Sequence, residues 1–177
     1  SEKKGVPRAE FVSTVGKPLP PAGDPGGFAC TFAAFRRATA LADCGVSRVH
    51  AGNYRDAREA FEESIAIDPR GPQAAAAHVW LGELALMEAT SATSPAAARA
   101  EREYRAALPL GPPPPLGMHA ELGLGILALR RGDAAEAEAA LDRALQAVPP
   151  QPVALVARYL LGVARLLLGR PAEANAL

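Results

Sequence analysis

The chain has 177 residues, of which 49% are hydrophobic, 21% are charged and only 5% are aromatic. Its 19 basic and 19 acidic residues give a formal net charge of zero, which argues against a nucleic-acid partner. No apolar run approaches the roughly 20 residues that a membrane-spanning helix needs, and the sequence has no signal-peptide core. Because the chain begins with Ser1 rather than Met, we expect it to be processed or excised from a longer protein.

Residues 1–27 differ in composition from the rest of the chain. Prolines and glycines recur there at short intervals without a helical period, so we predict a Pro/Gly-rich N-terminal extension, followed by a helical repeat domain over residues 28–177. The segment Phe28–Arg37 either lengthens the first helix of that domain or forms a short helix before it.

Four kinds of residue recur in register along residues 38–177. A glycine that follows a leucine or Cys44 recurs at intervals of 37, 43 and 37 residues. An alanine stands twelve residues after this glycine in three of the repeats and eighteen residues after it in repeat two. A bulky residue stands four positions after that alanine, and a proline eight positions further on. Such self-similarity indicates a repeat protein. The glycines are Gly45, Gly82, Gly125 and Gly162; the alanines are Ala57, Ala100, Ala137 and Ala174; the bulky residues are Phe61, Tyr104 and Leu141; the prolines are Pro69, Pro112 and Pro149.

This pattern resembles the tetratricopeptide repeat (TPR), a helix-turn-helix unit whose landmarks are Leu-Gly, Ala, an aromatic residue and Pro. The segment Gly52–Pro69 matches it most closely, whereas the usual tryptophan column holds Leu41, His78, Glu121 and Arg158. The resemblance implies an all-α fold, a right-handed α-solenoid of about three and a half TPR-like repeats. We place these repeats approximately at residues 38–71, 75–114, 118–151 and 155–177.

Each recurring residue suits the crossing of two helices. Gly and Ala let the two backbones approach, and the bulky residue is expected to fill the hole beyond that crossing. The column prolines should stop the second helices, and Gly52, Gly132 and Gly169 should adopt left-handed turns between helices. The distance from each proline to the next Leu-Gly pair exceeds the family pattern, so we expect longer first helices than usual.

The two halves of repeat two are separated by an additional loop, Thr90–Pro95. We expect Ser94 to cap the helix that follows and Pro95 to occupy its first turn. Repeat four stops midway through its second helix, which begins at Pro171.

By the same resemblance, the first helices line the inner, concave face of the superhelix, while the charged second helices face outward. The positions carried over to this chain are largely apolar, and an extended exposed apolar face marks a binding site. The predicted partner-binding groove consists of Val46, Val49, Val79, Glu83, Leu86, Met87, Leu122, Ile126, Leu129, Arg130, Tyr159, Val163 and Leu166, with Ala42, His50 and Leu167 beside them.

We therefore predict a non-enzymatic scaffold that binds a protein or peptide, in the form of an apolar or amphipathic segment. A carboxylate clamp is not expected, since its Lys, Arg and Asn positions hold Val, Leu, Ile and Ala. Other interpretations stay open. The groove residues could pack on one another as core, residues 8–21 could cover them, or the unfinished fourth repeat could form a homo-oligomer. The alanine-rich, arginine-for-lysine composition is typical of a high-GC bacterium, where the chain could be a regulatory or lipid-holding appendage of a larger assembly or enzyme.

No catalytic, cofactor or metal site is expected. The three histidines lie in separate helices or repeats, and the chain has neither a nucleophile elbow nor a phosphate-binding loop. On one continuous helix Cys30 and Cys44 would lie about 21 Å apart, so a disulfide would require a helix break near Phe35–Thr39. Cys44 occupies a leucine column, and we expect a buried thiol there. The compartment, cytoplasmic or periplasmic, stays undecided.

Overall fold

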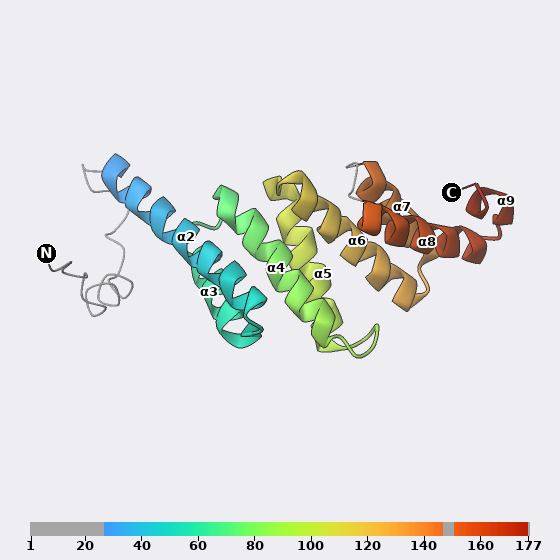
Figure 1. Cartoon of the computed structure of the whole chain (residues 1–177), viewed down its shortest axis with the longest axis horizontal. Helices are drawn as coiled ribbons and strands as arrows, with labels where there is room; N and C mark the ends of the chain where they lie inside the picture. The colour runs from blue at the N-terminus through green and yellow to red at the C-terminus, as the bar shows by residue number, and fades with distance from the viewer. Residues whose placement is uncertain (1–26, 147–150, 177) are drawn as a thin grey trace, which may run out of the picture.

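The computed structural model describes residues 27–146 and 151–176, with the backbone alone for residues 27–34 and 151. These described residues form eight α-helices and no strand, and the helices follow one another along the long axis of the molecule (Figure 1). The predicted all-α solenoid is therefore confirmed. Residues 1–26 of the predicted extension lie outside the described residues. The helices are α2 (Gly27–His50), α3 (Tyr54–Ile67), α4 (Pro72–Glu88), α5 (Pro95–Ala107), the short 3-10 turn η1 (Leu108–Leu110), α6 (Pro114–Arg131), α7 (Ala134–Gln146), α8 (Gln151–Leu167) and α9 (Pro171–Ala174).

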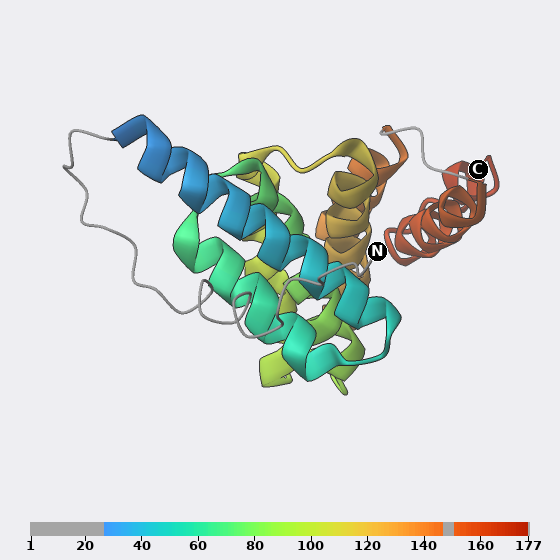
Figure 2. The same ribbon diagram turned by 60° about the vertical axis from the view of Figure 1, so that its left-hand side comes forward.

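Consecutive helices form hairpins, in which α2 packs on α3, α4 on α5, α6 on α7 and α8 on α9. Figure 2 shows α2 lying along α3 at one end of the array. The first helices α4, α6 and α8 have 17, 18 and 17 residues, whereas the second helices α3, α5 and α7 have 14, 13 and 13. The first helices are thus longer than the second helices of the hairpins.

The first helix of repeat one, α2, runs from Gly27 to His50 without a break. The segment Phe28–Arg37 therefore lengthens this helix. A separation of fourteen residues corresponds to a rise of about 21 Å along a continuous helix, which excludes a disulfide between Cys30 and Cys44. Cys44 carries a free thiol and is half-buried rather than buried. Its column is less covered here because no earlier helix pair among the described residues packs on α2.

Three helix-to-helix turns share one hydrogen-bond pattern. Gly52, Gly132 and Gly169 have φ values of 75°, 82° and 73°, in the left-handed region that favours glycine. At each turn, the glycine amide and the next amide donate hydrogen bonds to two adjacent carbonyl oxygens in the last turn of the helix. At Gly132, the glycine amide donates to Leu129 and the amide of Asp133 donates to Ala128. This is the arrangement of a Schellman motif, and it confirms the predicted turn glycines.

The additional loop of repeat two ends in the predicted cap. The Ser94 hydroxyl oxygen accepts a hydrogen bond from the amide of Ala97 at 3.1 Å, and Pro95 occupies the first position of α5. The side chain thereby satisfies one of the amides that a helix start leaves without a partner.

The column prolines end a second helix in one repeat and not in another. Helix α3 stops two residues before Pro69, as predicted. Helix α5 instead ends at Ala107, well before Pro112. The reason is Pro109, which has no amide to extend the helical hydrogen-bond ladder, so the chain tightens into the 3-10 turn. Pro149 lies outside the described residues.

Each bulky column residue packs directly on the glycine of its own repeat, not beyond the helix crossing. A Cβ atom added to any of these glycines would approach the bulky side chain to between 2.5 and 2.7 Å, which no ordinary contact allows. The bulky side chains and the column alanines beside them are fully buried. The missing Cβ is thus what lets the second helix sit close to the first. The pairs are Phe61 on Gly45, Tyr104 on Gly82 and Leu141 on Gly125.

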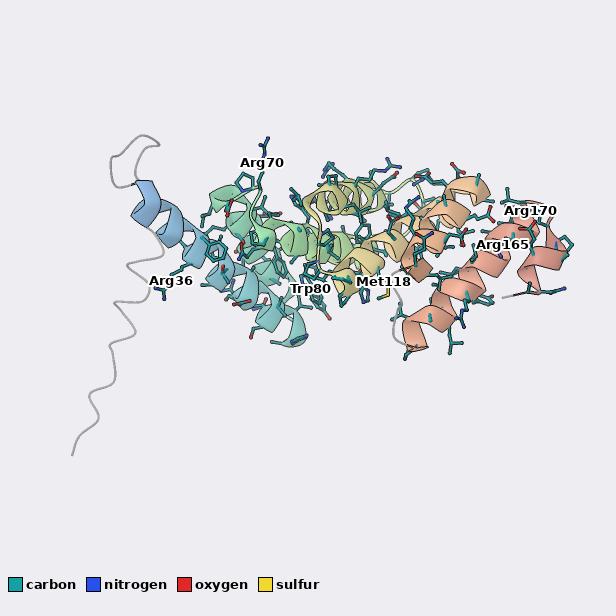
Figure 3. All side chains as sticks on the ribbon, turned by 90° about the horizontal axis from the view of Figure 1, so that it is seen from above. Arg36, Arg70, Trp80, Met118, Arg165 and Arg170 are labelled. Carbon is teal, nitrogen blue, oxygen red and sulfur yellow. The ribbon has the colours of Figure 1, made fainter. Side chains whose placement is uncertain are left out.

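Aromatic side chains join the first two repeats. The ring of Phe61 stacks on that of Trp80, with centroids 6.3 Å apart and the ring planes nearly parallel. Trp80, labelled in Figure 3, lies on α4, so this contact crosses from repeat one to repeat two. Such a pair adds to the area that the two rings bury and holds the hairpins in register.

Candidate functional site

The groove residues of repeats one and two are mostly part of the packed interior. Val79 is fully buried within the central core, so its side chain cannot line an open groove as the sequence predicts. Val46 and Val49 are half-buried and pack on the core of repeat one, and Leu86 packs on the central core. Met87 is different, since 64% of its surface is exposed.

Glu83 is the charged member of the predicted groove in repeat two, and its carboxylate is hydrogen-bonded to a core side chain. The hydroxyl of Tyr104 donates to its Oε1 at 2.9 Å. Burial raises the pKa of Glu83 above its ordinary value, while the bond from Tyr104 and the nearby His119 act in the opposite direction. Burial and the adjacent carboxylate likewise raise the pKa of Tyr104. The pair is a partly buried hydrogen bond between the two helices of repeat two rather than an open ligand site.

The predicted groove residues of repeat three are also mostly packed on a core. Leu122 and Leu129 are half-buried and pack on the core between α6, α7 and α8, and Ile126 is half-buried as well. Arg130 is exposed, and its Nη1 lies 3.4 Å from the carbonyl oxygen of Ala89 in the loop after α4. The open possibility that groove residues pack as core thus describes most positions of the first three repeats.

Exposed apolar side chains gather instead on α8. Of the eight large hydrophobic residues that are exposed among the described side chains, five belong to this one helix. Tyr159 and Leu166, both predicted as groove residues, are 72% and 56% exposed, and Val163 between them is half-buried. The predicted groove did not include Leu155 or Val156. The five residues are Leu155, Val156, Tyr159, Leu166 and Leu167.

The opposite side of α8 is packed. Leu161 and Ala164 are buried against the helices of repeat three. Arg165 pairs with Glu138 of α7 at 3.2 Å, and Arg170 pairs with the same carboxylate. These two arginines, labelled in Figure 3, lie at the end of the array. The hydrogen bond from Arg170, together with the bond from Arg165 and the charges of both arginines, lowers the pKa of Glu138. Helix α8 is thus apolar on two sides, of which one is covered.

A surface hollow of about 380 Å³ lies over the exposed side of α8. Gly162, the fourth of the recurring glycines, lines this hollow, and so do a residue of α9 and the residue after that helix. We call this feature the α8 hollow. It is lined by Leu155, Arg158, Tyr159, Gly162, Val163 and Leu166 of α8, together with Ala174 and Asn175.

A second hollow lies between α3, α4 and α5, and several charged side chains line it. Its arginines, Arg58 and Arg99, both pair with Glu88, and His78 lies 2.8 Å from the carboxylate of Glu103. Arg58, Arg99 and His78 thus each have an acidic partner within the protein. Within the described ranges, no three His, Cys, Asp or Glu side chains gather as a metal site, and no helix is long and apolar enough to cross a membrane.

Comparison with known proteins agrees with the repeat geometry. A family model described as tetratricopeptide repeat matches three overlapping segments, residues 45–113, 96–152 and 122–177, which together span well over half of the chain. A search of curated proteins found no match. Tetratricopeptide repeats generally mediate protein-protein interaction and generally act without catalysis. The helix pairs, the glycine columns with their bulky partners and the matched segments together show that the chain belongs to the tetratricopeptide repeat family.

Proposed function

We propose that this protein is a non-enzymatic scaffold that binds a partner protein through the exposed apolar side of α8. The observation that carries the proposal is the concentration of exposed large hydrophobic residues on that helix, while the corresponding face of the earlier repeats is mostly packed. Contiguous apolar surface is uncommon on a monomer and usually marks an interaction site.

The proposal narrows the binding region that the sequence predicts. Leu86 and Leu129 pack on cores, so replacing them with a charged residue would disturb the fold as well as any interface. Tyr159 and Leu166 project from a helix whose packed side lies elsewhere, so they can be changed with little effect on folding. They are therefore the residues on which the function can be tested.

The test compares the proteins that co-purify with the wild-type chain and with the double variant Tyr159→Lys/Leu166→Lys. Met87→Lys is the matched control, because Met87 is an exposed apolar residue on the first helix of another repeat. We expect a discrete set of proteins to be lost with the double variant and kept with the control, while far-UV circular dichroism is unchanged. Recovery of the same set with all three proteins would contradict the proposal.

Two other possible occupants of this face can be distinguished from a partner protein by experiment. A second copy of the chain would make the sedimentation mass rise with concentration, and the double variant would abolish that rise. The chain's own residues 8–21, which lie outside the described residues, would be detected by removing them and finding that the face gains affinity for the same partners.

A further inference from the structure

The hollow between α3, α4 and α5 carries the same charge pattern on two neighbouring helices. It has a volume of about 260 Å³, and it is lined by α3 and α5, the second helices of repeats one and two, as well as by α4. Arg58 and Glu62 line it from α3. Arg99 and Glu103 line it from α5. On each helix the glutamate follows the arginine by four residues, which places both on one face about one turn apart. We call this feature the α3–α5 hollow.

Like charges share each end of the α3–α5 hollow. Arg58 and Arg99 lie at one end, because both pair with the carboxylate of Glu88 at the end of α4. Since α3 and α5 have equivalent places in successive hairpins, they run in the same direction, and Glu62 and Glu103 lie one turn further on, at the other end. Groups of like charge repel, so these four side chains cannot pair with one another across the hollow.

The junction of repeats two and three shows the alternative, in which second helices are bridged directly. Arg105 of α5 pairs with Glu136 of α7 at 2.6 Å. Arg131 of α6 pairs with the same glutamate and with Glu101 of α5. These facing helices present opposite charges, so the protein joins them with its own side chains. Among the described residues, no ion pair joins α3 to α5 in this way.

Each end of the α3–α5 hollow can accept a charge from outside. At the acidic end His78 pairs with Glu103 at 2.8 Å, whereas Glu62 is exposed and has no ion pair within the described part of the chain. At the basic end two guanidinium groups share the single carboxylate of Glu88. A bound segment would therefore place a basic side chain between the glutamates and an acidic side chain near the arginines.

An apolar residue extends the charge pattern by one turn. Ile65 follows Glu62 by three residues on α3, and both line the hollow together with Leu81 of α4. Arg58, Glu62 and Ile65 thus form one stripe of α3, at spacings of four and three residues. A helix that lies along this stripe matches it by carrying an acidic, a basic and an apolar residue at the same spacings.

We propose that the α3–α5 hollow binds a helical segment of a partner protein that carries an acidic, a basic and an apolar residue along one face. The basic side chain lies between Glu62 and Glu103, and the apolar side chain packs on Ile65. The acidic side chain pairs with the two arginines at the other end. This surface is separate from α8, so the inference goes beyond the proposed function.

The probe is a synthetic alanine-rich peptide of about 15–20 residues, a length at which such a chain forms a helix in water. It carries Glu, Lys and Leu at the spacings of Arg58, Glu62 and Ile65. Fluorescence anisotropy measures its binding to the 177-residue chain. We expect saturable binding that weakens at high salt and weakens about tenfold or more when the peptide's Lys is replaced by Ala.

Variants of the protein localise the site. Glu62→Lys should weaken binding about tenfold or more. Glu59→Lys is the matched control and should leave binding unchanged, because Glu59 is an exposed glutamate of the same helix that does not line the hollow. A peptide in which the Lys is replaced by Glu should recover binding to the Glu62→Lys variant. This exchange separates a specific charge pair from an effect of net charge.

The double variant Tyr159→Lys/Leu166→Lys distinguishes this surface from α8. We expect it to bind the peptide as tightly as the wild-type chain does, since neither residue lines the α3–α5 hollow. Far-UV circular dichroism of every variant checks that the helices are retained, so a loss of binding is not a loss of fold.

Four results would overturn the inference. They are no saturable binding of a peptide shown to be helical, equal weakening by Glu62→Lys and Glu59→Lys, loss of binding in the α8 double variant, and self-association of the wild-type chain that Glu62→Lys removes. None of these results refutes the proposed function, which fails only if the co-purifying proteins are unaffected by changes at Tyr159 and Leu166. The two proposals can therefore fail separately.

Discussion

The ring of Tyr104 lies between glycines of two repeats. Adding a methyl group to one of these glycines tests how closely the ring is confined. A Cβ atom on Gly82 of α4 would lie 2.5 Å from Cε1 of the ring, and one on Gly123 of α6 would lie 2.4 Å from Cε2. The two glycines thus meet opposite edges of one fully buried ring. Gly123→Ala pushes the ring toward α4, where no space is available.

The expected loss of stability follows from two opposing effects. Overpacking a dense core costs about 1–3 kcal/mol, and the upper half of that range applies because the ring is confined on both edges. Replacing glycine within a helix by alanine returns up to about 1 kcal/mol. The net loss is about 1–2 kcal/mol, which for a domain of this size lowers Tm by roughly 2–8 °C.

Thermal unfolding followed by circular dichroism measures this effect, with Gly117→Ala as the matched control. Gly117 lies in the same helix, and a Cβ there would meet its nearest neighbour at an ordinary 3.5 Å. The control should keep or raise Tm. Combining Gly123→Ala with Tyr104→Ala should remove most of the penalty of the added methyl group, because the ring that it strikes is gone. If Gly123→Ala raised Tm as the control does, the confinement of the ring would be disproved.

Three further predictions concern the buried pair and one turn. Tyr104→Phe leaves the Glu83 carboxylate without its donor and should cost about 1–3 kcal/mol at neutral pH and less in acid, measured by urea unfolding at both pH values. Because burial raises the pKa of Glu83 above 4.5, its stabilising contribution is complete below that pH and is lost as the pH rises through the raised value. Glu83→Gln should therefore gain stability relative to wild type between pH 4.5 and neutrality, and a constant difference would contradict this. Gly132→Ala should cost about 1 kcal/mol and Gly132→Asn less, since φ is 82° there; equal melting temperatures for the two variants would argue against a left-handed turn.

The fold could be predicted from the sequence because its signals are local and repeated. The glycine and alanine columns indicate a helix crossing that is the same in the first three repeats. The turn glycines indicate a left-handed backbone region that other residues avoid. The end of α5 was less predictable. Pro112 stands in the proline column, but Pro109 removes a donor earlier in the chain and ends the helix first. The recurring proline marks where the second helix ends in a typical repeat. An earlier proline in one particular repeat ends the helix before that position.

The candidate site was predicted less well, because exposure depends on neighbours that a column does not encode. Assigning groove positions by family resemblance treated the four repeats as equivalent. It included Val79, which the core encloses, and omitted Leu155, which nothing among the described residues covers.

Val79 and Tyr159 make the same point from one column. Both stand three residues before the recurring glycine, yet Val79 is fully buried and Tyr159 is 72% exposed. Val79 lies in a repeat whose second helix is complete and which has a further repeat packed on it, whereas Tyr159 has neither among the described residues. Large apolar side chains at such a position are stabilised only when something is packed on them. The recurring column therefore predicts where the helices cross, but not whether a side chain at that column is buried.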